Sequence, residues 1–470
     1  MATTRSPSGG GMSNLLSFQL PDLVALTSAF PFRVNGNCKF ATDGSEGWFL
    51  GNPNTNTNLT SSSRPVPIPT PVEKEKVVTA MDGQPPLLDE EERATLHGAK
   101  YGLLASLCAP GADGAPLRIL ADWVGVVGVG HVRILRGKGH GWVGVGSGME
   151  NGDVSWVERA EDGLEVLEGN VLLRSVVPRL RRLRDRLPQA QRAQWNRRFT
   201  HSVKAFAKVQ LTLYENLKGG VVPTLPEYIQ LRREMYGSSM FVDLLDFLEI
   251  TEMPRGISGR EREVLGEITF WASHVVAWVL DIFSYASGTT GATRCNSHNL
   301  ISLLTTHKNL SVQGAMNYAG GMVKEALEEI QRLERELLPL LSSTNGSAEA
   351  GWGAGWISSL RSVVGLADGM APRGAGWKFL VDVPLDDLDR GISSWYLEGE
   401  DDVGAARSLE EAKRKGELEV AKYVRAMKDW IMGSIHWGYE TEVYFGVKGD
   451  EVRSFGWVFL VRNDETEGRA

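Results

Sequence analysis

The chain has 470 residues, of which 42% are hydrophobic, and a formal net charge of −8 at pH 7. This length and composition allow a sizeable hydrophobic core. The acidic balance gives no reason to expect a nucleic-acid partner. The three cysteines, Cys38, Cys108 and Cys295, are widely separated and odd in number. They fit a reducing compartment better than a disulfide framework, so a cytoplasmic protein is expected.

The first residues, Met1–Met12, are rich in Ser, Gly and Thr and lack the apolar core of a secretory signal. We predict a disordered N-terminal extension over residues 1–29 and one domain over residues 30–470. The most apolar window, Ile268–Tyr285, is interrupted by His274 and Asp281 and is short for a membrane span. It therefore predicts a buried core helix, and no membrane span is expected.

Helical periodicity dominates the second half of the chain. Apolar residues recur every three or four positions in several segments, most of them bounded by Pro or Gly. These segments are Val203–Lys218, Pro226–Gly237, Arg260–Tyr285, Ser311–Leu341 and Leu409–Phe445. Residues 342–377, with repeated Gly and Trp, interrupt the pattern and predict an insertion that is either a surface loop or a lid.

A glycine pattern and a basic run each have two interpretations. Gly139–Gly144 satisfies G-x-G-x-x-G, and a strand over Val132–Leu135 would suit a dinucleotide site. A flexible glycine loop is favoured, because the rest of the chain shows no alternation of strands and helices. The basic run Arg179–Arg184 has helical spacing and acidic neighbours, which favours a solvated helix face over a binding patch.

Several separated motifs occur in the order typical of one enzyme family. Leu280–Gly288 resembles the Asn-Asp-x-x-Ser-x-x-x-Glu metal helix of class I terpene synthases. Further matching segments are Phe30–Phe32, Glu46–Trp48, Arg198–Phe199, Tyr214–Asn216, Pro223–Tyr228, Leu231–Gly237, His298–Leu300, Leu310–Tyr318 and Tyr423–Phe445. The chain thus resembles class I terpene synthases of the fungal and bacterial sesquiterpene cyclase type. The resemblance implies an all-α helical bundle around an apolar central cavity.

The departures from the family pattern fall where the family binds metal and diphosphate. In the family, Asn, Ser and Glu at i, i+4 and i+8 place three oxygen ligands for Mg²⁺ on one helical face. The same face here carries Leu280, Ser284 and Gly288. The aspartate-rich motif would fall in His131–Leu135, which contains no carboxylate. The arginine that clamps diphosphate is replaced by Val443, next to the retained Tyr444.

Arg233, at the family's diphosphate-sensing arginine, and Gly237, at its effector glycine, are retained. Ionising an allylic diphosphate requires neutralising roughly three negative charges in a dry cavity. One arginine, one serine hydroxyl and His131 do not replace the missing oxygen ligands. No cofactor and no metal ligands are therefore expected, and Mg²⁺ would be required only if the ordinary family mechanism operates.

The resemblance places a set of candidate site residues around the cavity. The expected catalytic residues are His131, Arg233 and Tyr444. The expected substrate-binding residues are Gly237, Asp281, Ser284, Trp278 and Asn299. Buried aromatic residues on the predicted helices would stabilise cationic intermediates through their π faces, although core packing is the simpler interpretation for each one. They are Phe206, Trp271, Trp278, Phe283, Trp430 and Trp437.

Three functional classes fit this pattern. The favoured one is a terpene cyclase of isoprenoid natural-product (secondary metabolite) biosynthesis, of lyase or isomerase type, that acts on a hydrophobic terpenoid without Mg²⁺-dependent ionisation of a diphosphate. The second is a divergent Mg²⁺-dependent sesquiterpene synthase that uses farnesyl diphosphate. The third is a non-catalytic terpenoid-binding pseudoenzyme. The expected partner is a hydrophobic isoprenoid or terpenoid small molecule, and a homodimer is left open.

Overall fold

The computed structural model describes residues 15–51, 86, 88–137, 155–248, 259–286, 296–343 and 409–461. The N-terminal elements are β1 (Leu15–Gln19), α1 (Leu23–Leu26), α2 (Cys38–Phe49), α4 (Glu90–Ala99), α5 (Tyr101–Cys108), α6 (Gly114–Leu135), α7 (Ser155–Arg159), α8 (Gly163–Glu168), η3 (Leu173–Ser175), α9 (Val177–Arg184) and α10 (Gln189–Gly219). The later elements are α11 (Leu225–Met235), α12 (Ser238–Phe247), α13 (Gly259–Ala286), η5 (Asn296–His298), α14 (Leu300–His307), α15 (Val312–Ser343), α18 (Leu409–Glu440), α19 (Glu442–Phe445), η6 (Gly446–Lys448), α20 (Gly449–Phe455) and β2 (Trp457–Val461).

The predicted all-α fold is confirmed, with one two-stranded sheet as its β-structure among the described residues. Val132–Leu135 lies within α6, so the strand required for a dinucleotide site does not form. The long helix predicted to end at Phe445 breaks at Thr441, which separates α18 from α19. The Thr441 hydroxyl donates to the carbonyls of Gly98 and Ala99 at 3.2 and 3.1 Å, which fixes this break. The predicted insertion at 342–377 falls almost wholly outside the described residues.

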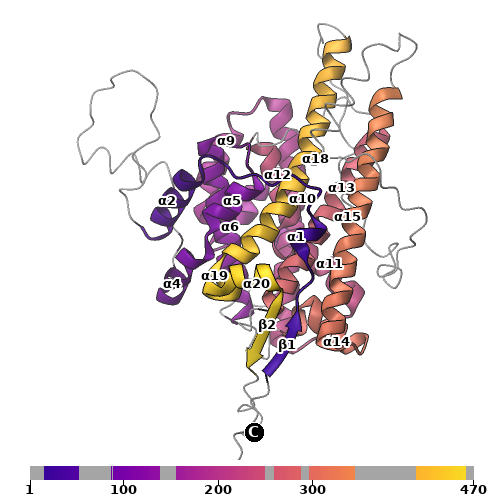
Figure 1. Cartoon of the computed structure of the whole chain (residues 1–470). Helices are drawn as coiled ribbons and strands as arrows, with labels where there is room; N and C mark the ends of the chain where they lie inside the picture. The colour runs from indigo at the N-terminus through magenta and orange to yellow at the C-terminus, as the bar shows by residue number, and fades with distance from the viewer. Residues whose placement is uncertain are drawn as a thin grey trace, which may run out of the picture.

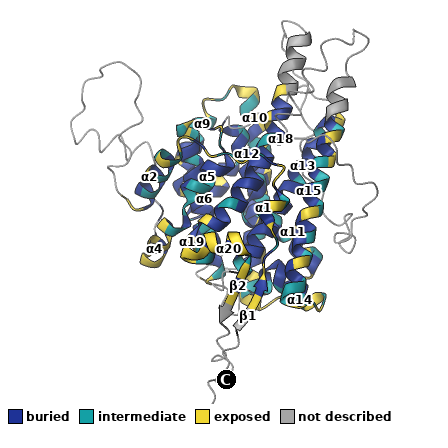
Figure 2. Ribbon diagram, in the orientation of Figure 1, coloured by how far each residue is buried: buried dark blue, intermediate teal, exposed yellow. Residues whose placement is uncertain are grey.

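Helix α13 lies at the centre of the bundle. It packs between α15 and α18, and α18 in turn packs on α5 (Figure 1). Helix α5 contacts α6 and α2, while α10 supports α8, α11 and α12. The central helices are buried along much of their length, whereas α4 and the sheet carry many exposed residues (Figure 2).

Two described helices, α6 and α13, are long and apolar enough to cross a membrane by length and composition. However, 61% and 83% of their most apolar windows are buried inside the protein. The same test is passed by core helices of soluble proteins, so these two helices are weak evidence for a membrane span. The cytoplasmic location stays a prediction.

Part of the segment predicted to be a disordered extension is regular structure, because Leu15–Gln19 form β1 and Leu23–Leu26 form α1. Strand β1 pairs antiparallel with β2, and Phe18 lies opposite Val458 on the buried face. Gln313 on α15 exchanges two hydrogen bonds with the backbone of Gln19, at 2.8 and 3.1 Å. The prediction of disorder is therefore wrong for these residues, since a short alternating segment gains order from a partner strand distant in sequence.

A buried ion group links α6 to the basic helix α9. The carboxylate of Asp122 is fully buried and accepts hydrogen bonds from Arg118 at 3.0 and 3.2 Å, and also from Arg179. The Arg179 guanidinium also lies over the Trp48 ring, 4.5 Å from its centroid. The prediction of a solvated basic face is thus wrong for Arg179, whose charge is neutralised inside the core.

Candidate active site

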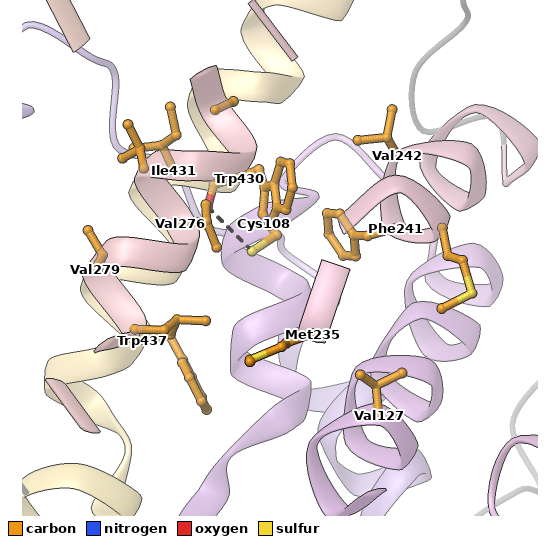
Figure 3. Close-up of a cluster of buried hydrophobic side chains, with 14 of the residues drawn as sticks. Cys108, Val127, Met235, Phe241, Val242, Val276, Val279, Trp430, Ile431 and Trp437 are labelled. Atoms are coloured by element: carbon orange, nitrogen blue, oxygen red, sulfur yellow. Dashed lines mark hydrogen bonds between the residues drawn. The ribbon is translucent and has the colours of Figure 1, made fainter. Parts of the chain in front are cut away.

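Apolar side chains from α5, α6, α11, α12, α13 and α18 meet in the interior of the bundle (Figure 3). The Phe241 ring stacks on Trp430 with centroids 5.0 Å apart, and the Cys108 thiol contacts the Trp430 carbonyl at 3.8 Å. We refer to this group as the apolar cluster; it consists of Cys108, Val127, Met235, Phe241, Val276, Val279, Trp430 and Trp437. Its composition suits contact with a hydrocarbon skeleton.

A buried group of polar side chains lies beside the apolar cluster. We refer to it as the polar cluster; it consists of His131, Tyr228, Arg232, Tyr236, Asp281 and Tyr444. Its centre is an ion pair in which Arg232 Nε lies 2.6 Å from the Asp281 carboxylate, with both side chains 3% exposed. The Arg232 guanidinium also lies over the Tyr236 ring, 4.5 Å from its centroid. The Arg232 guanidinium is therefore held by the charge of Asp281 and by the π face of Tyr236.

Helix α11 and its C-cap residue Tyr236 supply three members of the polar cluster from one face. Tyr228, Arg232 and Tyr236 follow one another at intervals of four residues, so their side chains project in the same direction. Thr224 and Glu227 form a capping box that fixes the start of this helix. Gly237, with φ +66°, ends this arrangement and starts α12. Gly237 thus allows the tight turn between α11 and α12. Its role in substrate binding stays a prediction.

His131 lies near the end of α6 and packs against the Tyr236 ring with centroids 4.2 Å apart. Burial, followed by the charge of Arg232, lowers the pKa of His131 to about 3. The imidazole is therefore neutral near pH 7 and can accept a proton, or exchange hydrogen bonds with a neutral group. Its Nδ1 atom is buried and has no hydrogen-bond partner in the described part of the chain.

Tyr444 on α19 connects the polar cluster to aromatic side chains. Its ring lies 5.7 Å from Phe283 and 5.7 Å from Trp437, the second contact being edge-on. Burial raises the pKa of Tyr444 well above its usual range, as does the neighbouring Tyr236. The hydroxyl therefore keeps its proton and is suited to donating a hydrogen bond.

Arg233 points to a different set of neighbours from Arg232. Its Nε atom lies 3.2 Å from the Glu234 carboxylate, and its guanidinium lies over the Phe270 ring at 5.5 Å. Its charge also lowers the pKa of His274, after the larger effect of burial. The structure thus brings His131 and Tyr444 together around Tyr236, whereas Arg233 faces Phe270 and His274. The catalytic role of Arg233 stays a prediction.

Asp281, Ser284 and Asn299 are brought together where α13 meets α14. The Asp281 carboxylate accepts from Tyr228 at 2.7 Å and from the Leu300 amide at 3.1 Å, in addition to Arg232. The Asn299 amide donates to the Asp281 carbonyl and to the Ser284 hydroxyl at 2.9 and 3.0 Å. These bonds join the two helices, and the substrate-binding roles of the three residues are untested.

Trp278 is 1% exposed and lies beside His274, with ring centroids 5.3 Å apart. The other aromatic residues singled out in the sequence are also buried on helices, as predicted. They are Phe206, Trp271, Phe283, Trp430 and Trp437. Of these, Trp430 and Trp437 belong to the apolar cluster, which makes them the best placed to contact a hydrocarbon.

Replacing His274 by Gln is expected to reduce the loss of stability in acid. Burial lowers the pKa of His274 to about 3, while an unfolded histidine titrates near 6.5. Between these values the unfolded chain binds the extra proton, so stability falls as the pH falls. The His274→Gln variant should lack this term, worth about 2 kcal/mol at pH 5. Urea unfolding at pH 7.5 and pH 5 measures how much the free energy of unfolding falls between the two pH values. His307→Gln, at an exposed histidine, is the matched control. An equal fall in wild type and His274→Gln would contradict the expectation.

Comparisons with known proteins show which proteins this chain is similar to. Residues 168–329 match the model described as terpene synthase family 2, C-terminal metal binding. The chain is 23% identical to sesquiterpene synthase Agr1 of Cyclocybe aegerita over 96% of each chain. It is 21% identical to alpha-muurolene synthase of Coprinopsis cinerea, over 82% of this chain and 72% of that protein. The solved structure of hedycaryol synthase in complex with nerolidol covers 87% of this chain and 96% of its own, with a TM-score of 0.50 and 14% identity.

The chain is a class I terpene synthase-like protein. The resemblance noted from the separated motifs is thus confirmed. The matched region runs from the end of α8 into α15 and includes Arg232, Arg233, Tyr236 and Asp281. It does not include His131 or Tyr444.

The donor groups of this terpene synthase-like protein do not fit the magnesium site that the family implies. On α13, Leu280 offers no ligand, and the Asp281 carboxylate is already bound by Arg232, Tyr228 and a backbone amide. At the end of α6, Arg133 pairs with Glu92 at 2.6 Å. Among the described residues, His, Cys, Asp and Glu form no group of three or more that could hold a metal ion. Mg²⁺ prefers several oxygen ligands in octahedral geometry, which this donor set does not supply.

Three members of the polar cluster were not among the site residues expected from the sequence: Tyr228, Arg232 and Tyr236. Arg232 and Arg233 are adjacent, so on a helix their side chains point about 100° apart, as expected for 3.6 residues per turn. The family pattern drew attention to Arg233. The i, i+4 spacing of Tyr228, Arg232 and Tyr236 was the available signal, because it predicts a shared face.

Proposed function

We propose that this protein is a terpenoid cyclase of natural-product biosynthesis that acts on a hydrophobic isoprenoid substrate without magnesium-dependent ionisation of a diphosphate. The observation that carries the proposal is the ligand face of the metal helix: Leu280 offers no oxygen, and the Ser284 hydroxyl already donates to the Asp281 carbonyl and accepts from the Asn299 amide. The oxygen of this face that remains among the described residues therefore joins two helices of the fold. The relatives named as sesquiterpene synthases support an isoprenoid substrate.

The chain's own residues supply the chemistry of this proposal. The net reaction of an uncharged substrate is an isomerisation: the substrate gains one proton at its oxygen or at a double bond and loses one proton from carbon to neutral His131. The aromatic faces of Trp430 and Trp437 stabilise the positive charge on the hydrocarbon between these two proton transfers. The hydroxyl of Tyr444 donates a hydrogen bond at the polar end of the site. The surrounding apolar side chains exclude water, which would otherwise quench a cation.

A second candidate function is a divergent sesquiterpene synthase that ionises farnesyl diphosphate. It is favoured by the names of the relatives, among them sesquiterpene synthase Agr1 and alpha-muurolene synthase. A pseudoenzyme that binds a terpenoid without converting it is the third. Conversion of an uncharged terpenoid distinguishes the proposed cyclase from the pseudoenzyme. Release of pyrophosphate from farnesyl diphosphate distinguishes the sesquiterpene synthase from both.

The purified protein is expected to release no pyrophosphate from farnesyl or geranylgeranyl diphosphate, with or without magnesium. The reason is that the polar cluster contains one cation, Arg232, and that this cation is already paired with Asp281. Pyrophosphate release is measured together with product analysis by gas chromatography. A sesquiterpene synthase with an intact aspartate-rich motif, run in parallel, checks the assay. A magnesium-dependent burst of pyrophosphate with a hydrocarbon product would refute the proposal and establish the second candidate.

A further inference from the structure

We propose that the polar cluster binds one neutral oxygen, a hydroxyl or a carbonyl, of a terpenoid whose hydrocarbon part lies against the apolar cluster. The substrate class is then an oxygenated, uncharged terpenoid. This inference rests on the proposed function and specifies its substrate. It is carried by the charge balance of the cluster, by its buried nitrogen atoms and by its position beside the apolar side chains.

The charge balance of the polar cluster is neutral. Although burial lowers the pKa of Arg232, the Asp281 carboxylate and the neighbouring tyrosines raise it above its usual range, so the guanidinium stays charged. Its single positive charge is matched by Asp281 at 2.6 Å. His131 is neutral, and so are the three tyrosines of the cluster near pH 7. A diphosphate would bring about three negative charges into this buried place without matching cations, which costs several kcal/mol.

Two buried nitrogen atoms in the cluster have hydrogen-bonding capacity to spare. Arg232 Nη1 and His131 Nδ1 are both buried and have no hydrogen-bond partner in the part of the chain that the structure describes. Both side chains contact Tyr236, whose ring lies 4.5 Å from the guanidinium and 4.2 Å from the imidazole centroid. His131 is 7% exposed. An unsatisfied buried polar atom costs about 1–3 kcal/mol, which a bound oxygen would recover.

The chemistry of these two nitrogen atoms favours an uncharged oxygen. A guanidinium donates hydrogen bonds, while a neutral imidazole can donate or accept, depending on its tautomer. A hydroxyl offers lone pairs to the guanidinium and a proton to the imidazole, and a carbonyl accepts from both. One oxygen within hydrogen-bond distance of both nitrogen atoms would satisfy both groups.

The polar cluster lies directly beside apolar side chains. Met235 of the apolar cluster precedes Tyr236 in the chain, and Trp437 contacts the Tyr444 ring at 5.7 Å. Trp437 also stacks on Tyr101 at 6.2 Å. A molecule with an apolar skeleton and an oxygen at one end matches this arrangement. A pure hydrocarbon would leave both buried nitrogen atoms unsatisfied.

The test compares the binding of matched probes to the purified full chain. Tryptophan fluorescence or calorimetry measures the affinity for geraniol, farnesol and geranylgeraniol, and for the hydrocarbon and the diphosphate with the chain length of the best alcohol, with and without magnesium. The best alcohol is expected to bind at least about tenfold more tightly than either matched probe, as one buried hydrogen bond provides. Equal binding of the hydrocarbon, tighter binding of the diphosphate, or no binding of any alcohol would overturn the inference.

Two variants test whether the polar cluster causes the preference for the alcohol over the hydrocarbon. His131→Phe keeps a ring but removes the nitrogen atoms, and it should abolish the tenfold preference for the alcohol over the hydrocarbon. The matched control is His436→Phe, whose ring packs against Phe32 at 4.1 Å. It should keep the preference. An unchanged preference in His131→Phe, or an equal loss in both variants, would contradict the assignment.

A spectroscopic measurement on the unmodified protein does not depend on the folding of any variant. The carbonyl stretch of bound farnesal should shift to lower frequency than in a hydrocarbon solvent, because hydrogen bonds weaken the C=O bond. An unshifted band would overturn the inference. Binding and turnover fail separately: alcohol binding without any cyclic product refutes the proposed catalysis, whereas cyclisation of a hydrocarbon without alcohol preference refutes only the oxygen site.

Discussion

Replacing Asp122 by Asn is expected to lower the free energy of unfolding by about 3–5 kcal/mol. The Asp122 carboxylate is fully buried between Arg118 and Arg179, each of which is 7% exposed. Asn has nearly the same shape but no charge, so two buried guanidinium groups would lose their shared anion. Urea denaturation of the purified variant measures the change, and a lower yield of soluble protein would accompany it.

Asp113→Asn is the matched control for Asp122→Asn. Asp113 is exposed at the start of the same helix, and its side chain makes no capping hydrogen bond. The control should change stability by less than about 0.5 kcal/mol. A loss below about 1 kcal/mol in Asp122→Asn would show that the ion group contributes little, as a well-packed neutral substitute sometimes does.

The largest expected effect on activity is a loss of turnover of roughly 10²- to 10⁴-fold in His131→Ala, which removes the proposed proton acceptor. Tyr444→Phe should lower turnover in the same direction, because it removes a hydroxyl from the polar cluster while keeping the ring contacts with Phe283 and Trp437. Initial rates with an uncharged terpenoid substrate measure both changes, and circular dichroism checks the fold.

Tyr439→Phe is the matched control for these two variants. Tyr439 also contacts the Phe283 ring, at 4.9 Å, but lies outside the polar cluster. It should retain near wild-type rates. If His131→Ala and Tyr444→Phe also retained such rates, shape control by the walls of the site would account for catalysis without help from these side chains. Arg232→Lys and Arg233→Lys, compared side by side, would then show which arginine contacts the substrate.

The long helices could be predicted from the sequence, because their apolar residues recur at helical intervals over many turns. The N-terminal strand could not, since its five residues pair with a strand near the other end of the chain. A local pattern contains no information on such a distant partner. The ion group of Asp122 was also missed: a helical charge pattern does not show that Arg179 turns into the core.

The candidate site was also predicted only in part from the sequence. The motifs located His131, Tyr444 and Asp281 in the right region of the fold, because all three contact or influence Arg232 and Tyr236. They did not distinguish Arg232 from Arg233. The difference is one of side-chain direction, which depends on how α11 is rotated against α13. A single residue of rotation decides whether a guanidinium faces the Asp281 carboxylate or the Phe270 ring.

The ribbon of β1 and β2 has a consequence for protein synthesis. Leu15 pairs with Val461, so the first described strand must wait for the last one to leave the ribosome. At the usual rate of about 5–20 residues per second, that delay is roughly 20–90 s. During it the backbone edge of β1 and the side chain of Phe18 lack their final partner. Chaperone occupancy on the nascent chain is therefore expected to persist until β2 has left the ribosome.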